Sequence, residues 1–130
     1  LDVLDRERKL GRRVLLAGVF GGRLSEGIDY HNGLLDAVAC IGIPNPPPSI
    51  HQKALRTYIE ERFGRANAWR YASTQPAINS ILQAMGRPIR SIDDRALILL
   101  LDKRNTDRTY LECFPKECLH ILLLVMMYLN

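Results

Sequence analysis

The sequence predicts an α/β domain in which helices cover a mostly parallel β-sheet. Three short runs are apolar almost throughout, at residues 14–20, 35–43 and 95–102, which is typical of strands buried on both faces. The segments between these runs are long enough to form the crossovers that parallel strands require. The chain has 130 residues, of which 47% are hydrophobic and 25% charged, so it can build one globular core.

The first elements along the chain are a helix, a strand and a long loop. Residues 2–10 have the pattern of an exposed helix, which Gly11 can terminate. The run from Val14 to Phe20 is bounded by glycines and is predicted to be a buried strand. The loop over residues 20–33 contains four glycines in 14 positions. Its polar residues make it a candidate site, although such a loop taken alone is more often a solvated turn.

A proline-rich connection and a helix follow the strand at residues 35–43. Four of the five residues 44–48 are proline, which excludes a helix or a central strand there. Ser49 is placed to cap a helix that runs to Gly64. This helix has an apolar stripe, which consists of Ile50, Ala54, Leu55, Tyr58, Ile59 and Phe63.

The last third of the chain predicts a second helix, a turn and a third strand. The helix is expected to start near Thr74, with Pro76 in its first turn, and to end near Gly86. A turn at residues 91–94 then leads into the strand at 95–102. The apolar end of the chain is too short to span a bilayer of about 30 Å, so we expect no membrane association and interpret this end as a buried strand, a core helix or a cut surface.

The charges and cysteines give weaker indications. Lysine and arginine outnumber acidic residues 18 to 14, which slightly favours a polyanionic partner. Three cysteines, an odd number, and the lack of a signal-peptide pattern favour a reduced intracellular compartment, cytoplasmic, nuclear or nucleoid. Cys113 and Cys118 lack further ligands nearby in sequence, so no metal site is predicted, and Cys40 is expected in the core.

The stretch QAMGRPIR, residues 83–90, is the most specific polar feature. On a helical wheel of about 100° per residue, Gln83, Arg87 and Arg90 lie opposite the apolar face of the predicted helix. Two arginines on one side repel each other unless an anion lies between them, and each can bind phosphate bidentately. Neutralisation by Asp93 and Asp94 is the alternative. Pro88 bends or ends the helix here and can turn Arg90 away from Arg87.

Taken together, four pieces of the sequence resemble the second motor domain of the XPD/DinG-type superfamily 2 DNA helicases. They are GGRLSEGIDY, the apolar strand after it, GIPNPPPS and QAMGRPIRSIDDRALILLLDKR, and their order and spacing match over residues 13–115. The resemblance implies a RecA-like, three-layer α/β/α fold with a mostly parallel sheet. It also implies that residues 1–130 are a single, partial domain, the C-terminal part of a truncated second motor domain.

The resemblance implies roles for two motifs. The stretch GGRLSEGID is similar to motif V, in which Gly27 and Asp29 would lie nearest the nucleotide. QAMGRPIR is similar to motif VI, which supplies the arginine fingers that reach the γ-phosphate of ATP. The residues implied for this catalytic role are Gln83, Arg87 and Arg90. Family members commonly have an aliphatic residue or alanine where Pro88 stands.

The resemblance further implies an interface with DNA or with the first motor domain, formed by Arg23, Ser25, Glu26, Lys103 and Arg104. It implies ATP with Mg²⁺, bound mainly by the first RecA-like domain, which carries the P-loop and the metal-binding acids. The track would be single-stranded DNA, followed from 5′ to 3′. An iron–sulfur cluster of such proteins is held by the first half, so the cysteines of this chain are not expected to ligate one.

Two other functions stay open from the sequence. A stand-alone nucleic-acid-binding or regulatory module could keep the helicase fold without motor activity. It would bind DNA with a strong salt dependence and without an effect of nucleotide. A nucleotide-binding protein unrelated to DNA is the weakest hypothesis, because the chain contains no GxxxxGK[ST] stretch of its own.

Overall fold

The computed structural model of the protein describes residues 2–28, 30, 33–89 and 91–118. The chain divides into two compact units, each built from two segments. The first unit comprises residues 1–41 and 80–101, and the second comprises residues 42–79 and 102–130. The expectation that residues 1–130 form a single partial domain stays a prediction.

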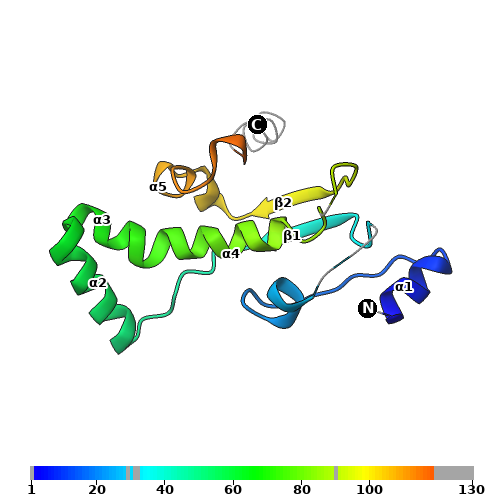
Figure 1. The fold of residues 1–130 in the computed structure, drawn as a ribbon, viewed down its shortest axis with the longest axis horizontal. Coiled ribbons are helices and arrows are strands. Elements are labelled where there is room, and N and C mark those ends of the chain that lie inside the picture. The colour runs from blue at the N-terminus through cyan, green and yellow to red at the C-terminus, as the bar shows by residue number, and fades with distance from the viewer. Residues whose placement is uncertain (1, 29, 31–32, 90, 119–130) are drawn as a thin grey trace. The chain divides into compact units, whose positions relative to one another are not determined.

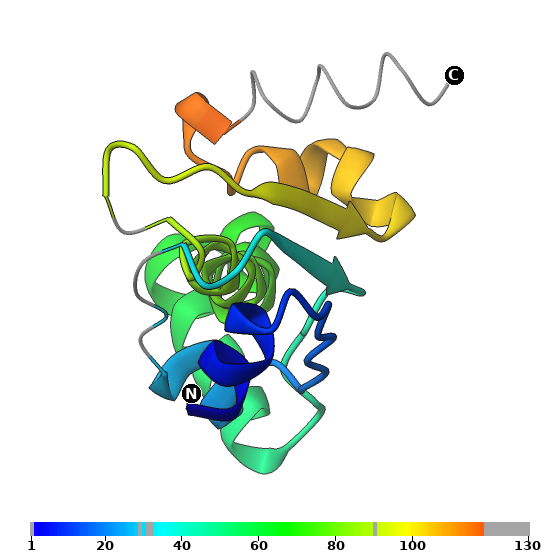
Figure 2. The same ribbon diagram turned by 90° about the vertical axis from the view of Figure 1, so that its right-hand side faces the viewer.

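The first unit contains a two-stranded parallel sheet. Strand β1 (Ala37–Ile41) pairs with β2 (Leu97–Leu101) in the register Ala37 to Leu97 through Ile41 to Leu101. The two arrows point the same way in Figure 2. The two parallel strands, together with the helices before, between and after them in the sequence, confirm the predicted α/β class with parallel pairing.

The predicted strand at residues 14–20 is wrong. Helix α1 (Asp2–Lys9) ends before Gly11, whose φ is +71°, and the chain then runs as an open trace to the π-helical turn η1 (Arg23–Gly27), as Figure 1 shows. Leu15 is 93% exposed and Val19 is 75% exposed. A strand needs a neighbouring backbone for its hydrogen bonds, and no described segment pairs with this one.

Burial of the sheet on both faces is also wrong for the part of the chain that the structure describes. Cys40 is buried, as predicted, with 2% of its surface exposed. The other residues of β1 and β2 are half-buried or exposed. An apolar run shows that a strand can be buried, but neighbouring layers decide whether it is.

The second unit begins with helix α2 (Ile50–Phe63), and both of its predicted ends are confirmed. The Gln52 amide donates to Ser49 Oγ at 3.0 Å, which caps the first turn. Gly64 ends the helix with φ +83°, and its amide donates to Glu60 O at 2.9 Å. The predicted apolar stripe of α2 is mostly exposed. Within α2 only Ile59 is buried, and it forms a cluster with Ala68 and Ala72.

A continuous helical run replaces the predicted helix start near Thr74. It consists of α3 (Arg65–Trp69), the π-helical segment η2 (Arg70–Thr74) and α4 (Gln75–Met85). Thr74 is fully buried inside this run and caps nothing. The helix ends at Met85, as predicted near Gly86. The last six residues of α4 belong to the first unit and the others to the second.

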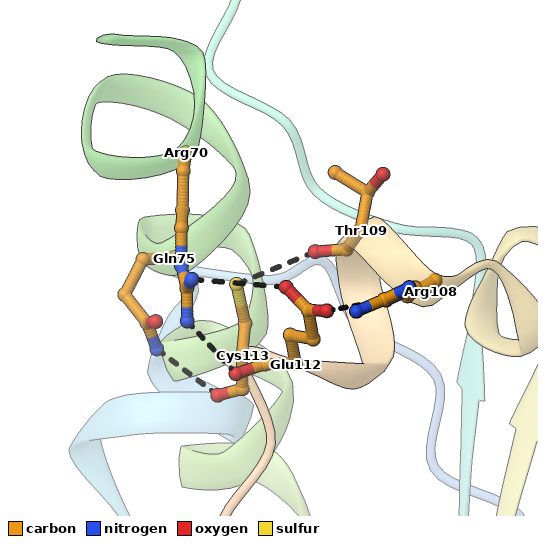
Figure 3. Close-up of polar contacts among 6 residues, drawn as sticks. All are labelled: Arg70, Gln75, Arg108, Thr109, Glu112 and Cys113. Carbon is orange, nitrogen blue, oxygen red and sulfur yellow. Dashed lines mark hydrogen bonds and ion pairs between the residues drawn. The ribbon is translucent and has the colours of Figure 1, made fainter. Parts of the chain in front are cut away.

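The second unit closes with the 3-10 helix η3 (Lys103–Thr106) and α5 (Arg108–Leu111). Figure 3 shows the polar contacts that join the residues just after α5 to η2 and to the first residue of α4. Gln75 Nε2 donates to Cys113 O at 3.1 Å, and Arg70 Nη2 donates to Glu112 O at 3.0 Å. Glu112 also pairs with Arg108 Nε at 2.7 Å. These contacts fix the segment that follows the DKR stretch, residues 102–104.

In the described parts of the chain, no helix is long and apolar enough to cross a membrane. The same parts contain no cluster of three or more histidine, cysteine or acidic side chains that could hold a metal ion. Burial raises the pKa of the Cys113 thiol, against the opposing effect of Arg70, so this cysteine is a protonated core residue. The apolar C-terminal end interpreted above lies outside the described residues from Leu119 onward.

Candidate functional site

The glycine-rich segment forms a tight turn around η1. Gly21 has φ +73°, which favours glycine. A Cβ on Gly22 would lie 2.9 Å from Val19 O, so a larger residue would force the turn to shift. The amides of Ser25 and Glu26 both donate to Gly22 O at 3.0 Å. The sequence predicted a loop here, and its glycines explain why the chain can turn so sharply.

Ser25 uses its hydroxyl inside this turn. Its Oγ donates to Gly22 O at 3.0 Å or to Val19 O at 3.2 Å. The neighbouring Arg23, Glu26 and Gly27 are exposed. Ser25 therefore stabilises the turn, while the exposed charges of Arg23 and Glu26 are accessible to a partner.

The segment of motif VI type begins at the end of α4. The last helical hydrogen bonds are Gly86 N to Leu82 O at 3.0 Å and Arg87 N to Ala84 O at 3.2 Å. Pro88 follows the helix end and is buried, with less than 2% of its surface exposed. Because Pro88 stands beyond the last helical turn, it removes no hydrogen bond from α4.

The guanidinium of Arg87 joins the two predicted motifs. Its Nε donates to Ser25 O at 2.6 Å and its Nη1 donates to Ile28 O at 3.1 Å. These residues are about 60 positions apart in the sequence and belong to the same compact unit. Arg87 is half-buried. Its described hydrogen bonds go to backbone carbonyls, whereas the alternative from the sequence paired the arginines with Asp93 and Asp94.

Tyr30 is a member of this site that the sequence interpretation missed. Its side chain is 4% exposed, and its hydroxyl donates to Leu24 O at 3.1 Å. Burial raises the pKa of Tyr30 above its ordinary value of 10.0, although the charge of Arg87 opposes this shift. The hydroxyl therefore keeps its proton at neutral pH. An aromatic residue just after the turn was the available signal, but only the fold shows which carbonyl it meets.

The structure does not bring every predicted site residue to this place. Gln83 is exposed on α4, and within the described part of the chain its side chain makes no hydrogen bond. Asp29 and Arg90, predicted near the nucleotide and the γ-phosphate, lie outside the described residues. The turn and Arg87 are thus the part of the predicted site whose geometry is defined.

The DKR stretch is in the second unit and has a different arrangement. Arg104 donates with Nε to Asp102 Oδ1 at 3.0 Å and with Nη2 to Asp102 Oδ2 at 2.7 Å. Asp102 also caps η3 by accepting from the Arg104 amide at 2.9 Å. These hydrogen bonds lower the pKa of Asp102 to about 2. Lys103 is exposed and Arg104 is half-buried, so Lys103 is the more accessible cation.

Comparisons with known proteins place similar sequences in one functional class. A family model described as "Helicase C-terminal domain" matches residues 3–120. The chain is 38% identical over 95 residues to the ATP-dependent DNA helicase XPD of Sulfolobus acidocaldarius, a match that covers 71% of this chain and 17% of that protein. It is 37% identical over 98 residues to the ATP-dependent DNA helicase chl1 of Schizosaccharomyces pombe, with 69% and 11% covered.

A third similar protein is the regulator of telomere elongation helicase 1 homolog of Caenorhabditis elegans. It is 34% identical over 110 residues, which cover 78% of this chain and 11% of that protein. The chain therefore spans less than a fifth of the length of each of these three relatives.

Proposed function

The chain belongs to the helicase C-terminal domain family, as its resemblance to the XPD/DinG-type superfamily 2 helicases predicted, and from this premise we propose its mechanism. We propose that it acts as part of the second RecA-like motor domain of an ATP-dependent DNA helicase. Residues 21–29 act as motif V and residues 83–90 act as motif VI. The observation that supports this most is the pair of hydrogen bonds from Arg87 to the carbonyls of Ser25 and Ile28.

Arg87 is the proposed arginine finger. Charge builds on the γ-phosphoryl oxygens during ATP hydrolysis, and an arginine supplied to them is worth about 10³–10⁵ in rate in comparable enzymes. The guanidinium of Arg87 has five N–H donors, and its charge persists at any working pH. Its half-buried place beside a glycine turn fits the phosphate side of such a site. Gln83 and Arg90 are proposed to complete the set of donors.

The remaining groups of the ATP site are assigned to two places. Gly27 and Asp29 are proposed to approach the nucleotide from this chain. Mg²⁺, which neutralises phosphate charge when bound, and the P-loop are assigned to a first motor domain. Any iron–sulfur cluster is also assigned to the first half of such proteins, as the resemblance implies, so Cys40, Cys113 and Cys118 are not proposed as its ligands.

Single-stranded DNA is the proposed partner, followed from 5′ to 3′, which implies an intracellular place of action. Arg23 and Lys103 are exposed cations that could contact phosphates, and Glu26 is exposed beside the turn. Ser25 is proposed to pass movement of the turn to the DNA side. Arg104 is proposed to have a structural role and not a role in contacting DNA, because its guanidinium is hydrogen-bonded to the carboxylate of Asp102.

Substitution of Arg87 tests the proposal. In the complete helicase that carries this sequence, Arg87→Ala should lower ATP turnover by about 10³-fold or more while ATP binding changes only a few-fold. Arg65→Ala is the matched control, since its side chain is 89% exposed and lies 3.9 Å from Glu60; turnover should be unchanged. Chain 1–130 alone should hydrolyse no ATP.

The alternative, a nucleic-acid-binding module without motor activity, is favoured by one observation. Arg87 already has acceptors in the backbone of the turn, so it could serve structure alone. In that case Arg87→Ala would destabilise the protein, the unsubstituted protein would hydrolyse no ATP in the presence of DNA, and DNA affinity would depend on salt but not on nucleotide. These outcomes would contradict the motor function.

A further inference from the structure

The turn η1 and the residue after it present three backbone carbonyls to side-chain donors. Leu24 O accepts from the Tyr30 hydroxyl at 3.1 Å. Ser25 O and Ile28 O accept from Arg87 at 2.6 Å and 3.1 Å. Carbonyls in the last turn of a helical segment lack partners within the segment. Tyr30 and Arg87 supply those partners, and the described contacts all lie within the first unit.

The two donors differ in what could draw them away. Arg87 is a cation that donates to neutral carbonyls, and a phosphate oxygen is a stronger acceptor for it because the bond is then charge-assisted on both sides. Tyr30 is a neutral phenol with one donor. Its ring is 4% exposed and therefore held by packing. An anion at this site would compete for Arg87 far more strongly than for Tyr30.

We propose that Tyr30 is a positioning residue for the turn: it holds the carbonyl of Leu24 while Arg87 exchanges the carbonyls of Ser25 and Ile28 for a phosphate. The inference rests on the proposed function for the identity of the anion. The exchange frees the Ser25–Ile28 end of the turn when a phosphate is present, and Tyr30 confines the movement to that end. Nucleotide state is thereby passed to the exposed residue Glu26, which lies within that end of the turn.

Hydrogen exchange at two amides reports this movement directly. The amides of Ser25 and Glu26 both donate to Gly22 O, so they exchange only when the turn opens. In the complete helicase without nucleotide, Tyr30→Phe removes one donor and keeps the ring, and exchange at both amides should rise about fivefold. ADP with aluminium fluoride, which mimics the transferring phosphoryl group, should raise exchange at Glu26 in the unsubstituted protein by a similar factor. Exchange at Ser25 should change much less, because its amide is in the same peptide unit as Leu24 O, which Tyr30 holds.

Turnover supplies a second measurement that a merely structural role would not move. Tyr30→Phe should lower the kcat of DNA-stimulated ATP hydrolysis about fivefold and leave the KM for ATP within about twofold. Tyr110→Phe is the matched control. The Tyr110 hydroxyl accepts a hydrogen bond from Asn45 Nδ2 at 3.2 Å, and both residues lie in the second unit. It should leave exchange at Ser25 and Glu26 unchanged.

The outcomes separate this inference from the proposed function. Unchanged exchange at both amides in Tyr30→Phe would overturn the inference, even if Arg87→Ala abolishes turnover. Faster exchange in Tyr30→Phe without any loss of turnover in Arg87→Ala would instead overturn the proposed role of Arg87 as the arginine finger. Should Tyr30→Phe fail to fold, the unsubstituted protein decides, because unchanged or slower exchange at Glu26 on adding the aluminium fluoride complex contradicts the release of Arg87.

Discussion

Arg87 and Arg104 use the same chemical group in two different ways. Arg87 directs its described hydrogen bonds at two backbone carbonyls, in the first unit. Arg104 directs a bidentate pair at the carboxylate of Asp102, in the second unit. Backbone carbonyls accept the hydrogen bonds of a guanidinium but do not neutralise its positive charge. A carboxylate accepts the hydrogen bonds and also neutralises the charge. The comparison distinguishes the two arginines by their acceptors, and our proposal that Arg87 binds an anion while Arg104 serves structure rests on this difference.

The largest expected effect tests whether that difference is functional. Arg87→Lys keeps the charge and loses the planar fork that reaches both Ser25 O and Ile28 O. In the complete helicase it should lower ATP turnover by about 100-fold, measured under saturating ATP and DNA. Arg104→Lys should act on stability and leave turnover per folded molecule within about threefold. Equal losses of turnover in the two variants would remove the distinction.

A smaller effect is expected from removing the carboxylate of the second arrangement. Asp102→Asn weakens the bidentate pair between Asp102 and Arg104 and also the cap of η3. It should lower the free energy of unfolding by about 1–2 kcal/mol at pH 7. The pKa of Asp102 is lowered to about 2 in the folded protein. Its stabilisation is therefore complete above about pH 4 and disappears as the pH falls toward 2, and denaturant unfolding across that range measures it.

Asp107→Asn is the control for this measurement. Asp107 stands at the start of α5 but makes no side-chain capping bond. Its substitution should change the free energy of unfolding at pH 7 by less than about 0.5 kcal/mol. If Asp102→Asn retained the full loss of stability between pH 4 and pH 2, that loss would arise from other groups.

The smallest expected effect extends the comparison to an exposed pair. Arg108 donates to Glu112 Oε1 at 2.7 Å, the same contact distance as in the Asp102–Arg104 pair, but its side chain is 91% exposed. Arg108→Ala should change the free energy of unfolding much less than Asp102→Asn does, because water and salt screen exposed pairs. A loss as large as that of Asp102→Asn would show that burial is not the cause of the difference.

Local chemistry explains the parts of the fold that were predicted correctly. Ser49 and Gly64 bound α2 because each satisfies the helix end through its own backbone or side chain. The start predicted at Thr74 failed because Arg70–Thr74 continue the helix from α3, so no cap is required. The strand predicted at residues 14–20 was wrong because an apolar run forms a strand only beside another strand. The presence of a neighbouring strand is not a local property of the sequence.

The site divides in the same way. The sequence identified the turn after Phe20 and the arginine at position 87 by motif, and the structure brings these two together through the contacts of Arg87. It could not identify Tyr30, because a buried hydroxyl has no distinguishing pattern until its acceptor is known. The functional roles of Gln83, Asp29, Arg87 and Arg90 stay predictions.

The sequence by itself determined the family and both ends of α2, because motifs and caps depend on residue type and close spacing; the phosphate-binding residues that it predicts stay predictions. Only the tertiary structure decided that Arg87 donates to the carbonyls of Ser25 and Ile28, and that the Tyr30 hydroxyl donates to the carbonyl of Leu24. Contacts between segments about 60 residues apart depend on how the chain packs. Packing is a collective result of burial and backbone pairing that short sequence patterns do not contain.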